Sequence, residues 1–165
     1  MTEKPVVVFL SGIPGSGKST IIKNKSDNGE WLDFVVLSVD SEIESIAKNQ
    51  GISATIAHKK HYKKCNKKIL KEFTHLLSQN RNVILDRNNA TKMQRETFLN
   101  LVPNNYHKKA VVIEAPVETA VSRVDARNKL VEKIFIPLGI VYTFAKNFEL
   151  PSKEEFDETE IIRNY

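Results

Sequence analysis

A glycine-rich octapeptide, GIPGSGKS at residues 12–19, carries the most specific chemical signal in the sequence. It matches the pattern G-x-x-x-x-G-K-[ST], in which backbone N–H groups surround phosphate oxygens and the lysine reaches the β- and γ-phosphates of a nucleotide. A valine-rich apolar run precedes it and a segment that can form a helix follows it, which is the context that the pattern requires. We therefore expect Lys18 to contact the phosphates of ATP and the Ser19 hydroxyl to bind Mg²⁺. The expected nucleotide-binding residues are Gly12, Ile13, Pro14, Gly15, Ser16, Gly17, Lys18, Ser19 and Thr20.

The rest of the sequence narrows the class of nucleotide-binding protein. A GTPase reads guanine with N-K-x-D at the end of a late strand, whereas NKSD occupies residues 24–27 here, directly after the phosphate loop, where it cannot reach a base. A motor or repair ATPase is larger than these 165 residues. A small kinase remains, with ATP and Mg²⁺ as its cofactors.

Two aspartates follow predicted strands, Asp40 after FVVLSV and Asp86 after NVIL. A kinase needs a carboxylate that orients and deprotonates the acceptor hydroxyl, at the carboxyl ends of strands beside the phosphate loop. Either aspartate alone is equally consistent with a helix cap or a turn. The occurrence of both at strand ends favours a function in the reaction.

Arginine is scarce, with six arginines against nineteen lysines, and its planar fork suits phosphate best. Arg123 and Arg127 lie four residues apart in a helix expected at about residues 118–132, so they share one face. An ordinary solvated helix is the alternative, with Glu118 and Asp125 nearby. The scarcity of arginine favours the interpretation that both side chains close over the triphosphate and neutralise charge as the γ-phosphoryl group moves.

Seven lysines and no acidic residue fall between His58 and Lys71. They lie on a long helix expected at residues 53–78, opposite a stripe of apolar residues three and four positions apart. Either they are the solvated side of an amphipathic helix, or they follow the phosphodiester backbone of a nucleic acid, which lysines bind with strong salt dependence. The seven are Lys59, Lys60, Lys63, Lys64, Lys67, Lys68 and Lys71, and the net charge of the chain is +5.

The alternation of strands and helices predicts an α/β fold, with a parallel sheet flanked by helices in one domain of residues 1–165. Strands are expected at residues 5–11, 34–40, 82–86, 110–114 and, as a short last strand, 156–162. Helices are expected after the phosphate loop, at 41–48 behind a capping box of Ser41 and Glu44, at 53–78, from a cap at Thr91, at about 118–132 and at about 138–148.

Composition excludes several classes of protein. The single cysteine, Cys65, excludes a disulfide framework. The longest apolar run, Val6 to Leu10, is far short of the roughly 20 residues that a spanning helix needs. The start, MTEKP, lacks the apolar stretch of a signal peptide. We therefore expect a soluble, cytoplasmic protein with no membrane partner.

Several longer segments carry a resemblance to a known family: VILDRNNATKMQRETF (83–98), APVETAVSRVDARN (115–128) and FELPSKEEFDETEII (148–162). Together with the phosphate loop and the strand that ends at Asp40, they resemble the kinase domain of the polynucleotide 5′-hydroxyl kinase family, almost from end to end. The resemblance implies a P-loop NTPase fold that binds ATP on one side and takes a nucleic acid, DNA or RNA, through an opposing opening.

The same resemblance implies residue roles. Asp40 would be the general base, Lys18 and Ser19 would hold phosphate and Mg²⁺, and Arg127 together with Arg123 would be the clamp of a lid. The catalytic residues are then Lys18, Asp40, Arg123 and Arg127, and the acceptor-binding residues are Asp86, Arg87, Asn88 and Arg95.

The chain departs from the family pattern in two places, both on the acceptor side. Ile43 stands three residues after the base, where the family often carries an arginine that holds the acceptor's neighbouring phosphate. The usual Asp-x-Thr-Asn is Asp-Arg-Asn-Asn at residues 86–89, so a hydroxyl is missing and Arg87 has entered.

Four functions therefore fit the sequence. The first is transfer of phosphate to a polynucleotide 5′-hydroxyl, and the second is phosphorylation of a hydroxymethyl-pyrimidine base in DNA, as in phage hypermodification. The third is a small-metabolite kinase of shikimate or gluconate type, although the chain has no Gly-Gly-Gly acceptor loop. The fourth, from a different class, is a nucleotide-binding regulator without turnover.

Overall fold

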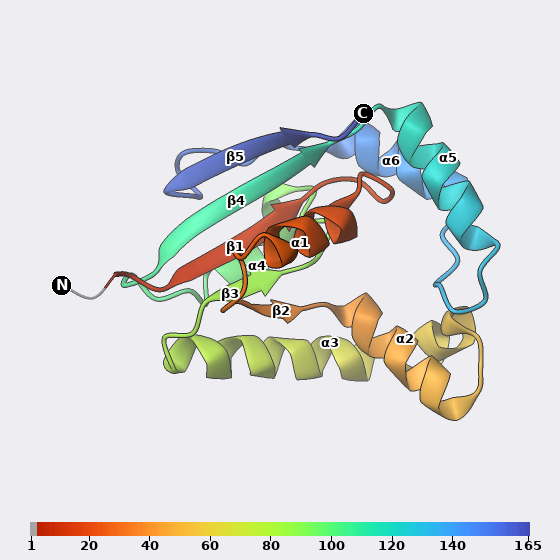
Figure 1. The fold of residues 1–165 in the computed structure, drawn as a ribbon, viewed down its shortest axis with the longest axis horizontal. Coiled ribbons are helices and arrows are strands. Elements are labelled where there is room, and N and C mark those ends of the chain that lie inside the picture. The colour runs from red at the N-terminus through yellow and green to blue at the C-terminus, as the bar shows by residue number, and fades with distance from the viewer. Residues whose placement is uncertain (1–2) are drawn as a thin grey trace.

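Five parallel strands form one sheet in the order β2-β3-β1-β4-β5, as Figure 1 shows. The structure is a computed structural model and describes residues 3–165. The strands are β1 (Val6–Ser11), β2 (Val35–Leu37), β3 (Val83–Leu85), β4 (His107–Glu114) and β5 (Glu158–Arg163). The helices are α1 (Lys18–Asp27), α2 (Val39–Gln50), α3 (Ala54–Ser78), α4 (Lys92–Leu99), α5 (Val117–Asn128) and α6 (Leu138–Asn147). The predicted α/β fold with a parallel sheet is confirmed.

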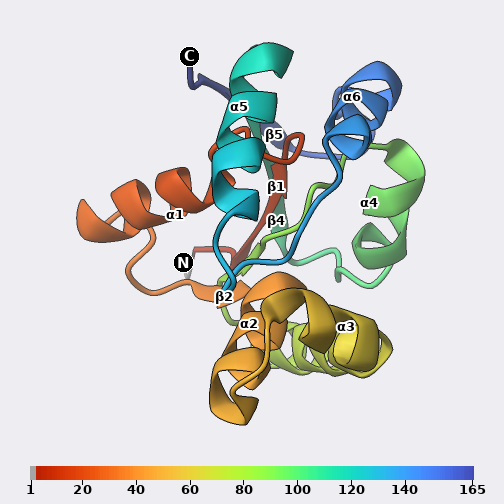
Figure 2. The same cartoon turned by 90° about the vertical axis from the view of Figure 1, so that its right-hand side faces the viewer.

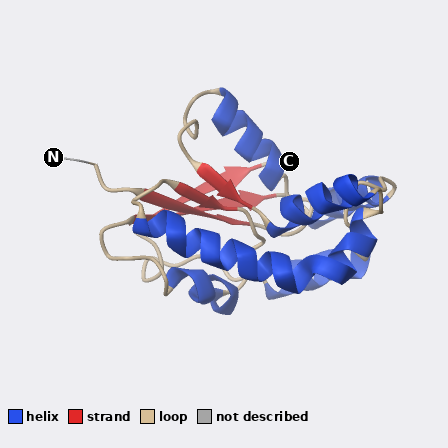
Figure 3. Cartoon of the chain, turned by 90° about the horizontal axis from the view of Figure 1, so that it is seen from below, coloured by secondary structure: helices blue, strands red, loops and turns tan. Residues whose placement is uncertain are grey.

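The valine-rich strand β1 lies at the centre of the sheet, between β3 and β4, and both of its faces are covered. Val7 and Phe9 face the layer that contains α2, α3 and α4, and Val8 and Leu10 face the layer that contains α1 and Trp31. Figure 2 shows α1 on one side of the sheet and α3 and α4 on the other, and Figure 3 shows α3 lying lengthwise along the sheet. The phosphate loop therefore emerges from the buried carboxyl end of the central strand.

The helix α2 begins earlier than the sequence pattern predicts. Ser38, not Ser41, is its cap, because the Ser38 hydroxyl accepts a hydrogen bond from the Ser41 N–H. Val39 and Ile43 lie four residues apart and are both buried, so the helical periodicity already starts at position 39. Asp40 consequently lies in the first turn of α2, where the positive end of the helix dipole favours a carboxylate.

Other boundaries differ less. The cap predicted at Thr91 is present, and the long helix predicted from residue 53 has Ser53 as its cap. The helix α5 ends at Asn128 rather than near residue 132, because the Asn128 side chain exchanges two hydrogen bonds with the backbone of Ile136. The strand β4 starts at His107, before the predicted start, because residues 107–109 already pair with β1, where Val6 lies opposite His107. Among residues 3–165, no helix is long and apolar enough to cross a membrane.

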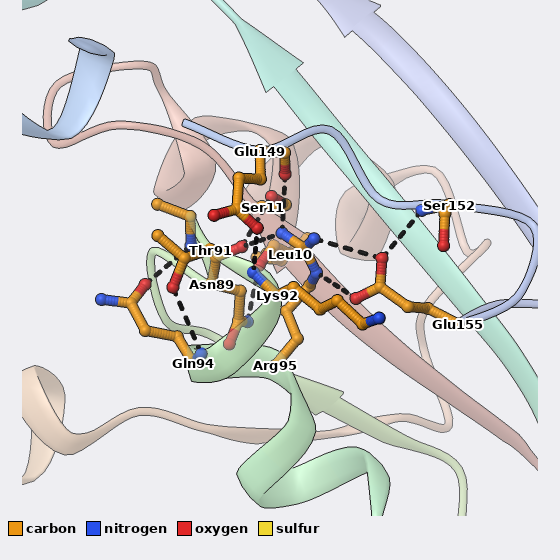
Figure 4. Close-up of polar contacts among 11 residues, drawn as sticks. Leu10, Ser11, Asn89, Thr91, Lys92, Gln94, Arg95, Glu149, Ser152 and Glu155 are labelled. Carbon is orange, nitrogen blue, oxygen red and sulfur yellow. Dashed lines mark hydrogen bonds and ion pairs between the residues drawn. The ribbon is translucent and has the colours of Figure 1, made fainter. Parts of the chain in front are cut away.

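One buried guanidinium ties together the segments that surround the phosphate loop (Figure 4). Arg95 on α4 is fully buried. It pairs with Glu155 through Nε at 2.8 Å and Nη2 at 3.2 Å, and its Nη1 donates to the carbonyl oxygens of Asn89 and Glu149. Because Arg95 is enclosed and paired in this way, the prediction that it binds the acceptor is wrong.

The network continues to the end of β1. Asn89 has a left-handed backbone with φ of +44°; its Nδ2 donates to Leu10 O at 2.7 Å, and its carbonyl accepts from the Ser11 hydroxyl. The adjacent Asn88 carbonyl accepts from the Gly12 N–H. Burial favours a raised pKa for Glu155, but the hydrogen bonds from Arg95 and Ser152, together with the positive charge of Arg95, outweigh it and hold that pKa below its usual range. The segment after β3 is thus fixed against the phosphate loop.

Replacing Arg95 with methionine leaves the carboxylate of Glu155 buried without its partner, which we expect to lower the free energy of unfolding by about 3–5 kcal/mol. Urea denaturation followed by circular dichroism measures the loss. The double variant Arg95→Met/Glu155→Gln leaves no charge unpaired and should recover part of the stability. A single variant as stable as the wild type would contradict this account.

Candidate active site

The loop between β1 and α1, residues 12–17, is shaped to hold an anion. Gly15 and Gly17 take left-handed backbone conformations, with φ of +80° and +104°, which glycine adopts at little cost. Gly15 also lies against α5, since a Cβ atom there would come within 2.4 Å of the Ala120 carbonyl oxygen. The loop leads into the N-terminus of α1, where free N–H groups favour a phosphate.

Lys18 lies at the centre of the site. Its Nζ donates hydrogen bonds to Gly12 O at 3.1 Å and to Ile13 O at 2.9 Å, so the side chain folds back over the loop. Burial of the ammonium group lowers the pKa of Lys18 to about 8, an effect that attraction to Asp86 opposes and repulsion from Arg127 strengthens. The lysine is therefore close enough to interact with both a carboxylate and an arginine of the predicted site.

The two predicted carboxylates lie side by side at the carboxyl ends of β2 and β3. The Asp86 N–H donates to Leu37 O at 2.9 Å, which continues the pairing of these strands to their ends. Burial raises the pKa of Asp86; attraction to Lys18 opposes this shift and repulsion from Asp40 adds to it. Asp40 is exposed, so of the two carboxylates it is the more accessible to an incoming hydroxyl.

The two arginines of α5 face the phosphate loop. Arg123 donates through Nη1 to the carbonyl oxygens of Gly15 and Ser16, at 3.2 and 3.3 Å. Arg127 lines the cleft beside the phosphate loop that also contains Lys18 and the two carboxylates. Its buried Nε has no hydrogen-bond partner among the described residues. The interpretation of this helix face as an ordinary solvated surface is therefore wrong.

One contact to the loop carries no signal in the sequence. Asn164 donates from Nδ2 to Ser16 O at 2.9 Å, and its own carbonyl accepts from Arg123. Its placement depends on the pairing of β5 with β4, because the Asn164 N–H donates to Glu114 O at 2.7 Å. Only the register of the last strand, which no local pattern encodes, could have revealed this residue.

A segment between α5 and α6, residues 129–137, closes over the cleft from the far side. Lys133 pairs with Glu44 of α2 at 3.0 Å. The Val131 carbonyl accepts from the Ala54 N–H, and the Phe135 N–H donates to the Thr55 hydroxyl. The segment spans from α5 to α2 and α3, as Figure 1 shows at the right of the molecule.

These elements enclose a cleft of about 340 Å³. The predicted residues that line it are Pro14, Gly15, Gly17, Lys18, Ser19, Asp40, Asp86, Arg87, Asn88, Arg123 and Arg127. The structure thus brings the loop, both carboxylates and both arginines to one place.

A second cleft, of about 480 Å³, opens on the other side of the two carboxylates. It shares Asp40, Asp86, Arg87 and Asn88 with the first cleft. Its remaining walls come mainly from α3, α4 and α6 and include three aromatic rings, those of Tyr62, Phe98 and Phe144. The two clefts meet at the carboxylates.

Arg87 is held firmly at this junction. Its Nη1 donates to Asn66 Oδ1 at 2.8 Å, and its guanidinium lies 5.1 Å from the centre of the Phe98 ring. Ile43, by contrast, is fully buried in the main core. The position at which the related family carries an arginine therefore points away from the acceptor side here, and Arg87 is the guanidinium that lines this junction.

The donor set fits a nucleotide with Mg²⁺. The unpartnered Arg127 Nε, the Lys18 ammonium and the N-terminus of α1 all favour an anion of high charge. Mg²⁺ is usually held by one or two carboxylates, a hydroxyl and the substrate phosphates, and the Ser19 hydroxyl and the Asp86 carboxylate line the cleft in which those phosphates would lie. Bound there, the ion would neutralise charge on the phosphate oxygens.

A parallel sheet with this loop on its central strand, surrounded by a lysine, two carboxylates and two arginines, defines a P-loop phosphotransferase. A family described as an AAA domain matches residues 7–151, and the chain belongs to that family. The protein is an enzyme of the P-loop kinase class.

Comparison with known proteins agrees with this class. The chain is 30% identical over 169 aligned residues to a protein of Acanthamoeba polyphaga mimivirus that is named as a bifunctional polynucleotide phosphatase/kinase. The match covers 99% of this chain and 34% of that protein, so the chain spans about a third of the relative's length.

Solved structures share the fold at low sequence identity. A kinase from Chloroflexus aurantiacus superposes with a TM-score of 0.73 at 14% identity, over 97% of this chain and 88% of the other. The Pnkp1/Rnl/Hen1 RNA repair complex gives 0.68 at 21% identity, over 89% and 45%. A gluconokinase from Sinorhizobium meliloti gives 0.56 at 15% identity, over 98% and 84%.

The lowered pKa of Lys18 makes nucleotide binding depend on pH. Above pH 8 the free protein increasingly carries a neutral Lys18, whereas a bound triphosphate favours the charged form, so binding must take up a proton. We expect affinity for ATP to fall about tenfold between pH 7 and pH 9. Calorimetric titration in two buffers of different ionisation enthalpy measures both the affinity and the proton uptake.

The matched control is Lys18→Arg, because arginine stays charged over this range. Its affinity should lack the decline above pH 8. A decline of the same size in this variant would assign the pH dependence to another group.

Proposed function

We propose that the protein transfers the γ-phosphate of ATP to a hydroxyl group of a nucleic acid, with the 5′-hydroxyl end of a polynucleotide as the acceptor. The observation that carries the proposal is the meeting of two clefts at Asp40 and Asp86. One cleft contains the phosphate loop and the positively charged side chains around it, and the other is lined by aromatic rings and Arg87. Such a layout suits a nucleotide on one side and an acceptor on the other.

On this proposal each residue of the site has a separate role in phosphoryl transfer. Lys18, Arg123 and Arg127 bind the β- and γ-phosphates, and Ser19 binds Mg²⁺. Asp40 accepts the proton of the acceptor hydroxyl as its oxygen forms a bond to the γ-phosphorus. The bond from that phosphorus to the bridging oxygen of the β-phosphate breaks, and ADP leaves. Asp86 orients the acceptor side of the junction.

Three features support a nucleic-acid acceptor. The mimivirus relative carries a polynucleotide kinase in its name. The rings of Tyr62, Phe98 and Phe144 give the second cleft surfaces on which a base can stack. Arg87 lies beside them with a planar fork that suits a phosphate. On this proposal Asp86, Arg87 and Asn88 bind the acceptor.

Two other acceptors remain as alternatives. A hydroxymethyl-pyrimidine base in DNA would use the same aromatic surfaces. A small sugar acid is the alternative that the shared fold of the gluconokinase favours, but aromatic rings are a poor match for a polar metabolite, and such an acceptor gives the lysines of α3 no role.

The Asp40→Asn variant separates an enzyme from a regulator that only binds nucleotide. Loss of the general base should lower the rate of phosphoryl transfer by about 10²- to 10⁴-fold, while ATP affinity changes little because the phosphate contacts remain. Steady-state kinetics and calorimetric titration on one preparation measure the two quantities. Unchanged turnover in this variant would remove Asp40 from the reaction.

The acceptor is tested by transfer of labelled γ-phosphate from ATP with Mg²⁺. The probes are DNA and RNA oligonucleotides with a 5′-hydroxyl, the same oligonucleotides with a 5′-phosphate, 5′-phosphorylated DNA containing hydroxymethyl-pyrimidines, and gluconate and shikimate. We expect label only on the strands with a 5′-hydroxyl. Label on the modified DNA or on a metabolite alone would replace the proposed acceptor.

A further inference from the structure

The seven lysines of α3 form two rows that face different ways. Lys59, Lys63, Lys67 and Lys71 are spaced by four residues, as are Lys60, Lys64 and Lys68. The cleft-lining residues of the same helix, Tyr62, Asn66 and Leu70, are also spaced by four. We call Lys59, Lys63, Lys67 and Lys71 the first row and the other three lysines the second row. Each of the three cleft-lining residues comes three positions after a lysine of the first row, so the first row lies directly beside the second cleft. The second row lies further round the helix, towards α2, where Lys68 pairs with Glu42.

The first row is free to bind an anion. Its four lysines are exposed, and none forms an ion pair within residues 3–165. The helix that carries them is fixed on its other side by buried Cys65, Ile69 and Phe73. A row from position 59 to position 71 is about 18 Å long at 1.5 Å per residue, which matches about five phosphates at the roughly 3.4 Å rise of a stacked strand.

The size and lining of the second cleft limit which part of a strand bound along this row can enter it. Its volume of about 480 Å³ lies in the range that holds one small-molecule-sized ligand, such as a terminal nucleotide. Its rings can stack on an unpaired terminal base that is splayed out from its strand, whereas the terminal base of a duplex is held by its paired partner. Tyr62, 38% exposed, lies where the row and the cleft adjoin. The rest of a bound strand must therefore leave the cleft across the surface of the protein.

We infer that the row Lys59, Lys63, Lys67 and Lys71 binds the phosphodiester backbone of a single-stranded polynucleotide whose terminal nucleotide occupies the second cleft. The inference rests on the proposed function and adds to it the form of the acceptor and the path of the strand. The second row, which carries the same kind of charge on the same helix, has no part in it.

The chain supplies a control of equal charge. Lys59→Gln/Lys63→Gln/Lys67→Gln and Lys60→Gln/Lys64→Gln/Lys68→Gln each remove three positive charges from exposed positions of α3. With a single-stranded 5′-hydroxyl decamer, the first variant should raise the KM about tenfold at 0.1 M salt. It should also lower the slope of log affinity against log salt by about 2, since each phosphate contact on a single strand contributes about 0.7. The second variant should stay within about twofold of the wild type.

Short and duplex acceptors complete the test. A mononucleoside 3′-phosphate reaches only the cleft, so both variants should phosphorylate it as the wild type does, and a blunt duplex should be a poor acceptor for all three proteins. Equal effects of the two variants on the decamer, or no effect of either, would overturn the inference. A blunt duplex used as well as the single strand would also overturn it. If one of these results is found but the mononucleotide is still phosphorylated, the inference fails while the proposed function stands. If no 5′-hydroxyl acceptor of any kind is phosphorylated, the proposed function itself is rejected.

Discussion

The buried pair between Arg95 and Glu155 is the interaction on which the placement of the site depends. The two charges lie sixty residues apart in sequence and join α4 to the segment that leads into β5. Through the carbonyl of Asn89 the same guanidinium fixes the chain that follows β3, and Asn89 in turn holds the last residues of β1. The acceptor-side residues are thereby set against the phosphate loop by hydrogen bonds whose loss would leave charges buried without partners.

Around this frame, opposite charges are distributed over separate elements. The loop and α1 supply Lys18, α5 supplies the two arginines, and the ends of β2 and β3 bring the carboxylates. Each group is held by its own strand or helix, so their separations are set by the packing of the sheet. The lowered pKa of Lys18 and the raised pKa of Asp86 both follow from burial in the same small space, which is typical of reactive sites.

Local sequence patterns predicted those parts of the structure that depend on neighbours in the chain. The phosphate loop, the alternation of strands and helices and the cap of α4 rest on short-range spacing, and the structure contains them. The start of α2 was misplaced because two serines three residues apart both suit a cap. Arg95 was misread because its partner is far along the chain, and Asn164 gave no signal because only the pairing of β5 places it at the loop.

The burial of Ile43 has a consequence for redesign. An arginine introduced there to restore the family pattern would put an unpaired charge into the main core, at a cost that the fold could not sustain. The short segment from Arg87 to Asn88 lies outside that core and borders both clefts. A change of side chain in this segment alters the surface that receives the acceptor without placing a charge in the core, so this segment is the place at which to retune which molecule receives the phosphate.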